Sequence, residues 1–284
     1  MTVEARAVTD RVDRDVRRYS ADHFTSLREE WQDIVRHGHL LYNLVYRDLT
    51  VRYKRSVIGF LWTMLNPLLL MIIFVVIFST LFRFAVPHYE TYFLSEFLPW
   101  TFFAQTTVSS MLSMSWNGSL MKRVRVPKSI FTLATTLSGM VNLLLSYVPL
   151  LLIMAILGVP IRPAILFLPI SFVIVAIFTF GVSLALSAVA VYFVDVREMY
   201  QVGLTALMYM CPIIYPISIV PARFRSIIAM NPLVYLFQIL RDPVYYGRMP
   251  SPELIGITLA LSGISLLGGW LLFRRLSPGF YPHL

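Results

Sequence analysis

Six long stretches of this chain contain no charged residue, and they limit its fold more than any other feature does. Each is at least 20 residues long, which is about the number that an α-helix needs to cross the hydrocarbon core of a bilayer. The six stretches are Val57–Phe82, Phe97–Met121, Ser129–Ile161, Pro163–Val194, Met199–Ala222 and Leu254–Phe273. The sequence therefore predicts an all-α integral membrane protein with six transmembrane helices.

A seventh charge-free stretch, Ser226–Leu240, is too short to span a bilayer. It has about 15 residues, contains Asn231-Pro232 and is followed by Arg241. A segment of that length is typical of a re-entrant or interfacial helix. We expect it to form a re-entrant external helical hairpin before the last span.

Composition agrees with a chain that has lipid as its solvent. Hydrophobic residues make up 57% of the chain and charged residues only 14%, whereas about a quarter of a soluble domain is charged. The net charge of +9 could indicate a nucleic-acid partner. The basic residues, however, flank the apolar stretches, as they do beside a membrane, and we expect no nucleic-acid binding.

The distribution of Lys and Arg predicts the orientation in the membrane. With six spans both termini lie on the same side, and that side collects 18 of the 24 Lys and Arg residues. Positively charged residues stay on the cytoplasmic side of a membrane protein. We therefore expect a multi-pass protein of the cytoplasmic (inner) membrane with both termini in the cytoplasm.

The sequence divides into four segments. They are a charged disordered tail (1–25), amphipathic cytoplasmic interface helices (26–56), a six-span domain (57–275) and a cytoplasmic C-terminal tail (276–284). The second segment opens with a capping-box pattern, Ser26-x-x-Glu29, and its apolar residues recur at helical spacing on both sides of Gly38. Such a helix is suited to the inner-leaflet interface, although packing on a soluble partner would give the same pattern.

The chain lacks the motifs of an ATPase and of a metal enzyme. A phosphate-binding loop needs Gly-Lys followed by Ser or Thr, and none of the 13 glycines precedes a lysine. The five histidines show no metal-ligand spacing. Ion-coupled transporters carry ionisable residues inside their spans, whereas these stretches have none. We expect no catalytic residue, no metal and no cofactor in this chain. Three roles stay open for it, namely a transporter driven by an external motor, a passive channel and a structural protein.

Aromatic residues are dense around the ends of the predicted spans, and two interpretations are open. Tryptophan and tyrosine form belts at membrane interfaces. Flat rings can also stack on the apolar faces of sugars, and a series of them would make a track for a polysaccharide. The candidates for a substrate path are Trp62, Trp100, Phe103 and Tyr209.

Four segments of the sequence indicate the same protein family. They are Leu44–Phe60 (LVYRDLTVRYKRSVIGF), Asn117–Ser129 (NGSLMKRVRVPKS), Asp195–Glu198 (DVRE) and Asn231–Tyr245 (NPLVYLFQILRDPVY). Together they resemble the type-2 ABC transporter permeases of the polysaccharide-export group, whose members export O-antigens, capsules, teichoic acids and galactans. The resemblance covers about residues 30–275.

The resemblance implies a half-transporter. Two copies of such a permease form one pathway, and two copies of a separate ABC ATPase, which binds ATP and Mg, attach beneath them. It implies that this chain is the transmembrane subunit of an ATP-driven exporter, moving lipid-linked polysaccharide of the O-antigen, teichoic acid or galactan type across the cytoplasmic membrane.

Two other functions compete with this one. A permease for a small molecule or a drug would belong to the same family. A membrane glycosyltransferase or ligase would come from a different class, and it would use an external carboxylate such as Glu90, Glu96 or Asp242 as its base.

Two basic clusters gain candidate roles from the resemblance. The string Asn117–Ser129 is similar to the coupling-helix region of the family, which predicts an ATPase-docking loop. Its residues are Lys122, Arg123, Val124, Arg125, Val126, Pro127 and Lys128. The second cluster lies where a lipid pyrophosphate would sit at the inner leaflet, and cations there recognise phosphate directly. Its residues are Arg47, Arg52, Lys54 and Arg55. Anchoring of the chain by positive charge would account for both clusters as well.

Overall fold

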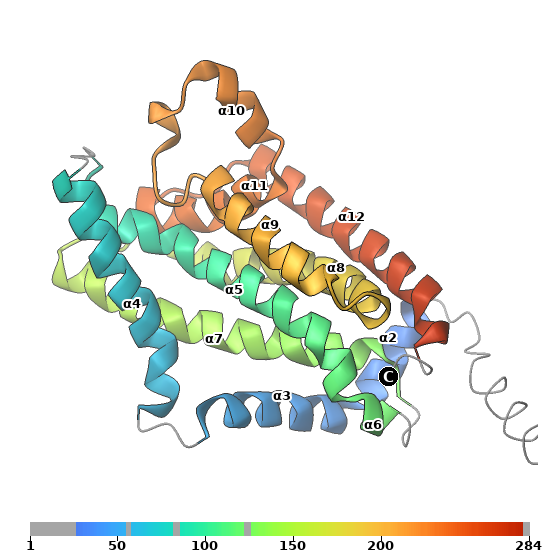
Figure 1. The fold of residues 1–284 in the computed structure, drawn as a ribbon. Helices are drawn as coiled ribbons and strands as arrows, with labels where there is room; N and C mark the ends of the chain where they lie inside the picture. Colours follow the sequence, from blue (N-terminus) through green and yellow to red (C-terminus); the bar gives the residue numbers. More distant parts are fainter. Residues whose placement is uncertain (1–26, 55–57, 82–85, 122–125, 281–284) are drawn as a thin grey trace, which may run out of the picture.

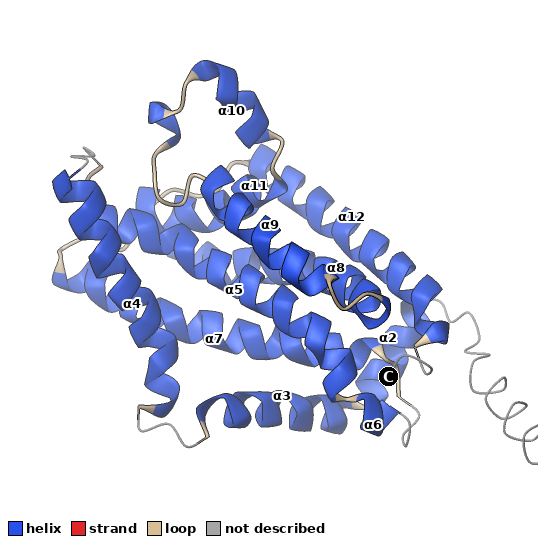
Figure 2. Ribbon diagram, in the orientation of Figure 1, coloured by secondary structure: helices blue, strands red, loops and turns tan. Residues whose placement is uncertain are grey.

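The structure is a computed structural model, and it describes residues 27–54, 58–81, 86–121 and 126–280. Every regular element in these residues is a helix (Figure 2), which confirms the predicted all-α fold for this part of the chain. Among the described residues, three segments are long and apolar enough to cross a membrane, namely Ser129–Ile156, Pro163–Tyr192 and Pro252–Gly279. A total of six spans stays a prediction.

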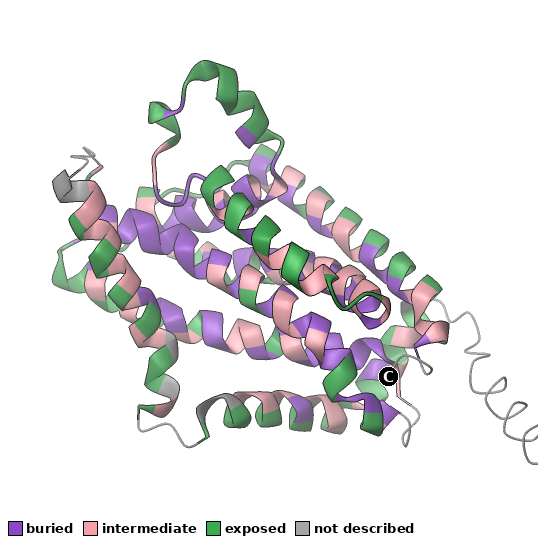
Figure 3. Cartoon of the chain, in the orientation of Figure 1, coloured by how far each residue is buried: buried purple, intermediate pink, exposed green. Residues whose placement is uncertain are grey.

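Helix α5 (Tyr89–Trp116) runs through the middle of the bundle (Figure 1). All ten residues of Thr91–Trp100 are buried, so this half of the helix is enclosed on every side (Figure 3). The helices that contact it include α4 (Trp62–Val75), α7 (Ser129–Ile156), α8 (Leu168–Tyr192) and α11 (Pro232–Arg241). The helix begins before the charge-free stretch that predicted it, because the carboxylate of Glu96 is neutralised inside the protein.

Helices α8 and α12 (Pro252–Leu276) pack with their backbones in close approach. A Cβ atom at Gly269 would lie 1.9 Å from the carbonyl oxygen of Gly181. Two serines of α12 also bond across the contact, with Ser262 Oγ donating to the Ile174 carbonyl at 3.0 Å and Ser265 Oγ donating to the Phe178 carbonyl at 2.9 Å. Small residues and hydroxyl bonds of this kind hold helices together in lipid.

Helices α4 and α9 (Val196–Met210) are attached to the bundle by one face each. Leu204 is the buried residue of α9, and Met199, Val202 and Tyr209 are exposed. On α4, Leu69, Ile72 and Ile73 are exposed as well. Both helices therefore leave an apolar face uncovered.

The predicted span Met199–Ala222 is not one helix. Helix α9 ends at Met210, because Pro212 disfavours helical backbone at the residue before it and has no N–H to donate. At 15 residues α9 is about 22 Å long, which is shorter than the roughly 30 Å hydrocarbon core. A loop and the short helix α10 (Ala222–Ala229) follow. Asn231 then caps α11, its side chain accepting the Leu233 N–H at 3.1 Å.

The opposite end of the bundle is formed by the N-terminal helices (Figure 1). Helix α2 (Leu27–Arg36) and helix α3 (Gly38–Tyr53) lie there, close to the short α6 (Gly118–Met121). Leu44 of α3 is buried, and α3 contacts α7. The remaining short elements are η1 (Gly59–Leu61), η2 (Val76–Leu81), η3 (Pro163–Phe167), η4 (Ile217–Ile219), η5 (Asp242–Tyr246) and η6 (Ser277–Gly279).

Candidate functional site

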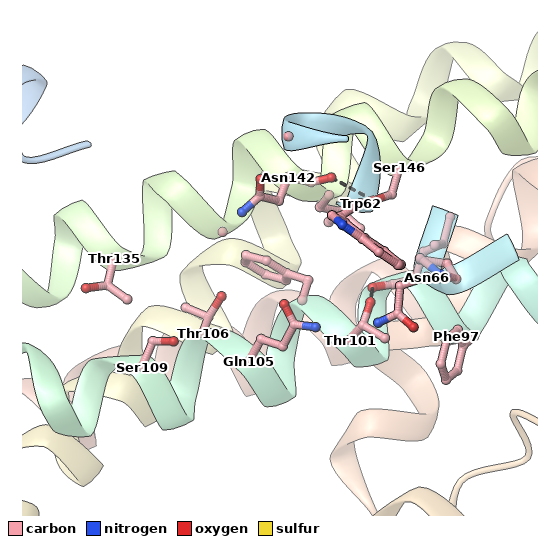
Figure 4. A pocket seen from close by; sticks show the side chains of 16 residues that line it. Trp62, Asn66, Phe97, Thr101, Gln105, Thr106, Ser109, Thr135, Asn142 and Ser146 are labelled. Atoms are coloured by element: carbon pink, nitrogen blue, oxygen red, sulfur yellow. Dashed lines mark hydrogen bonds between the residues drawn. The ribbon is translucent and has the colours of Figure 1, made fainter. Parts of the chain in front are cut away.

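A crevice of about 340 Å³ lies between α4, α5 and α7. Much of its wall is made of amide and hydroxyl side chains, and none of the residues that line it is charged. The polar lining residues are Asn66, Thr101, Gln105, Thr106, Ser109, Thr135, Asn142 and Ser146 (Figure 4). We refer to this cavity as the polar crevice.

The polar crevice arises from helical spacing on two facing helices. On α5, Thr101, Gln105 and Ser109 recur every four residues, which places them on one face of the helix. On α7, Asn142 and Ser146 have the same spacing, and Ser146 Oγ donates to the Asn142 carbonyl at 2.8 Å. A hydrophilic stripe on each helix, buried on α7 and partly exposed on α5, therefore faces the space beside α4.

Gly139 allows α5 and α7 to approach each other at the wall of the polar crevice. A Cβ atom there would lie 2.2 Å from Thr106 Oγ1 and 3.1 Å from the ring of Phe102. The hydroxyl of Thr106 is buried and has no hydrogen-bond partner among the described residues. It is thus an available donor and acceptor in the crevice wall.

Aromatic rings complete the lining. Phe97 and Phe102 come from α5, and Trp62 comes from the start of α4. The indole of Trp62 extends from α4 toward the polar side chains of the neighbouring helices (Figure 4), and 46% of this residue is exposed. Neutral amides, hydroxyls and ring faces together suit an uncharged, polyhydroxylated ligand, because amides and hydroxyls both donate and accept hydrogen bonds.

Only Trp62 of the four predicted path aromatics lines the polar crevice. Trp100 and Phe103 are buried in the core, with ring centroids 6.3 Å from Phe237 and 6.0 Å from Phe178 respectively. Tyr209 is 63% exposed on α9. A role of these three in a substrate path stays a prediction. Sequence reasoning missed Thr101, Gln105 and Ser109, although their four-residue spacing in a charge-free stretch was a usable signal.

The predicted ATPase-docking loop is described only at its end. Lys122, Arg123, Val124 and Arg125 lie outside the described residues. Val126 and Pro127 are half-buried, whereas Lys128 is buried and turns toward the C-terminal segment. Its Nζ donates to the Ser277 carbonyl at 2.8 Å and lies 5.7 Å from the centre of the Phe280 ring. Lys128 therefore ties the end of the loop to the end of α12.

The predicted phosphate-binding cations are only partly described. Arg47 is held by the protein, since it donates to Asn117 Oδ1 at 2.9 Å and to Asp48 Oδ1 at 2.9 Å. Lys54 is exposed at the end of α3. Arg52 belongs to α3 without a described side chain, and Arg55 lies outside the described residues.

The carboxylates proposed for glycosyl transfer do not line the polar crevice. Glu96 is buried and forms an ion pair of 2.8 Å with Arg241. Asp242 pairs with Arg248 at 3.0 Å, and Glu90 lies 3.5 Å from the ring nitrogen of His88. The charge-free stretch begins after Glu96, so the sequence placed Glu96 at the edge of a span. The structure places it inside the protein, where Arg241, a residue far along the chain, pairs with it.

Comparison with known proteins settles the family. The model of the ABC-2 type transporter family matches residues 39–245. This chain belongs to the ABC-2 type transporter family. The match confirms the family indicated by the four sequence strings, and it includes every residue that lines the polar crevice.

Proteins similar to this chain are known as polysaccharide export proteins. The chain is 29% identical over 244 residues to an O-antigen export system permease protein of Klebsiella pneumoniae, covering 85% of this chain and 93% of that protein. It is 30% identical over 243 residues to the protein of the same description from Myxococcus xanthus, covering 84% and 92%. A capsule polysaccharide export inner-membrane protein of Neisseria meningitidis is 22% identical over 245 residues, covering 84% and 92%.

Proposed function

We propose that this chain is the transmembrane subunit of an ATP-driven exporter that moves a lipid-linked polysaccharide across the cytoplasmic membrane. The observation that carries the proposal is the similarity to O-antigen export permeases over more than nine-tenths of their length. The polar crevice supports it, because its uncharged amides, hydroxyls and rings match the chemistry of sugars.

The polar crevice would contact sugar units during transport. A ring stacked on an aromatic face gains about 0.5–1.5 kcal/mol, by analogy with aromatic pairs. A neutral hydrogen bond contributes a similar amount, about 0.5–1.5 kcal/mol. Several such contacts orient a polymer and still release it, whereas charged groups would hold an ionic substrate more firmly. The crevice thus favours a polysaccharide over a charged small molecule.

The motor and the second half of the pathway come from other chains. Because the sequence has no Gly-Lys phosphate-binding loop, we assign ATP and Mg binding to two copies of a separate ABC ATPase, docked at residues 122–128. We assign the exposed apolar faces of α4 and α9 to contact with a second copy of this chain. The complex as a whole would be a translocase.

The proposed topology has six spans with both termini in the cytoplasm. In this arrangement α2 and α3 lie at the inner-leaflet interface, and Arg47, Arg52, Lys54 and Arg55 stand at the level of a lipid pyrophosphate. Helices α10 and α11 then form the external hairpin, which would re-enter the membrane before the last span.

The test uses cells that lack the chain, complemented with variants. Trp62→Leu and Asn142→Leu each remove one contact in the polar crevice, and we expect surface polysaccharide per permease molecule to fall by roughly two- to tenfold, as a contact of that size predicts. Trp116→Leu is the matched control, since Trp116 is 71% exposed and does not line the crevice. Surface polysaccharide that persists in cells without the chain would overturn the function. Unchanged export in both crevice variants would overturn the crevice's role alone.

A further inference from the structure

A second cavity, of about 710 Å³, opens between α7, α8 and α12. Its lining is almost entirely hydrocarbon and includes Leu137, Met140 and Leu144 of α7, Val173 and Ile177 of α8, and Leu266 of α12. Within the described part of the chain, these are the helices that are long and apolar enough to cross a membrane. We refer to this cavity as the apolar groove.

One end of the apolar groove is closed by polar groups. Glu30 of α2 reaches across it, accepting hydrogen bonds from the Ser129 hydroxyl through Oε1 and from the Trp270 indole N–H through Oε2. Trp31 of the same helix also lines this end. The guanidinium of Arg274 lies 5.0 Å from the centre of the Trp270 ring. One indole therefore has an anionic side chain at its N–H and a cationic side chain over its ring.

We propose that the apolar groove binds one acyl chain of a zwitterionic phospholipid whose headgroup carries a primary ammonium. An apolar cavity does not retain water, and lining atoms without a neighbour lose their dispersion contacts. A hydrocarbon chain from the bilayer removes that loss. The phosphate of the lipid then faces Arg274, and the ammonium faces Glu30.

The carboxylate of Glu30 has the capacity for this contact. An ionised carboxylate offers about four lone-pair positions, and the bonds from Ser129 and Trp270 use one on each oxygen. An ammonium supplies three N–H donors in a compact group. A quaternary choline headgroup has no N–H donor, so Glu30 discriminates between the two zwitterionic headgroups.

A second copy of this chain is a less suitable occupant. None of the residues that line the apolar groove belongs to α4 or α9, whose exposed faces we assign to self-contact. The groove also ends against α2, which blocks a helix lying along its whole length. Lipid is the apolar material that a bilayer supplies at this position.

The test is native mass spectrometry of the full chain co-purified with its ATPase. Dioleoyl phosphatidylethanolamine, phosphatidylcholine and phosphatidylglycerol are added in turn, and bound lipid is counted. We expect the ethanolamine lipid to bind most tightly. Glu30→Gln should lower its preference over the choline lipid by about two- to fivefold, the range of a partly exposed ion pair. Glu29→Gln, the same change on the same helix outside the groove lining, should leave the preference unchanged.

Filling the groove tests occupancy separately from headgroup choice. Val173→Trp places a large ring in the groove from a position that is 57% exposed, and Ala176→Phe fills it from a partly buried one. Each variant should bind one lipid fewer than the unchanged protein, whichever of the three lipids is added, and should still co-purify with the ATPase. An unchanged lipid count in both variants, a change of oligomeric state in place of lipid loss, or an unchanged headgroup preference in Glu30→Gln would each overturn the proposal.

Discussion

Arg241 holds three segments of the chain together through one guanidinium group. It pairs with Glu96 of α5 at 2.8 Å and donates to the Tyr92 hydroxyl and to the Pro212 carbonyl, both at 3.0 Å. Its Cζ lies 3.8 Å from the centre of the Tyr92 ring. Arg241 of α11, together with Tyr92 of α5, therefore supplies hydrogen bonds to the backbone of the loop after α9.

Arg241→Met should destabilise the protein strongly, because it leaves the carboxylate of Glu96 buried without its partner. Removing one member of a buried ion pair costs about 3–5 kcal/mol. Thermal unfolding of the purified chain measures the effect. The double variant Arg241→Met with Glu96→Leu should recover part of the loss, since no charge is then orphaned. Arg223→Met, on an exposed turn of α10, serves as the control. Equal unfolding temperatures for the single and double variants would contradict this account.

At the scale of elements, the contact between α8 and α12 depends on the absence of side chains. The carbonyl oxygen of Gly181 occupies the space that a Cβ atom at Gly269 would need. A residue with any side chain must push the helices apart and break the serine bonds that cross between them.

Gly269→Leu should therefore cost at least about 1–3 kcal/mol, the range for an overpacked contact. Its neighbour provides a matched control, because a Cβ at Gly268 meets nothing within 4 Å. Gly268→Leu should leave stability unchanged or raise it, since leucine is the better helix former. Unfolding midpoints of the two variants in one detergent decide the question, and a similar loss in both would remove the close-contact explanation.

Sequence patterns predicted helices better than they predicted contacts between residues far apart in the chain. The charge-free stretches located α7, α8 and α12, because a helix in lipid needs little more than continuous apolar length. The stretch Met199–Ala222 extends past the end of α9, where Pro212 ends the helix. The charge-free stretches failed at Glu96, since a buried charge is tolerated only through Arg241, whose contact comes from tertiary packing. The four-residue spacing of the polar residues on α5 can be read from the sequence. Their position beside Asn142 and Trp62 results from the tertiary fold and cannot be read from the sequence.

At the scale of the whole molecule, the proposed orientation predicts opposite chemical access to its two ends. Met249 is 61% exposed beyond η5, and Tyr46 is 62% exposed on α3. In a Cys211→Ala background, Met249→Cys should react with a membrane-impermeant thiol reagent added to intact cells, whereas Tyr46→Cys should react only after the cells are opened. Cys211 is fully buried, and its replacement removes the native thiol. Labelling of Tyr46→Cys from outside would reverse the orientation.

Three hydrogen bonds join the ends of helices near the start of α7. Lys128 is bonded to the Ser277 carbonyl, Ser129 to Glu30, and the Tyr192 hydroxyl to the Leu276 carbonyl. Because these bonds join the ends of α7, α8 and α12, we expect a force applied to one of these helix ends to be passed to the other two. Helix α4 packs on the bundle through a single face, so we expect it to move more easily than the helices joined by these bonds. The polar crevice is lined by α4 as well as by α5 and α7, so we expect its width to change when α4 moves relative to the other two helices.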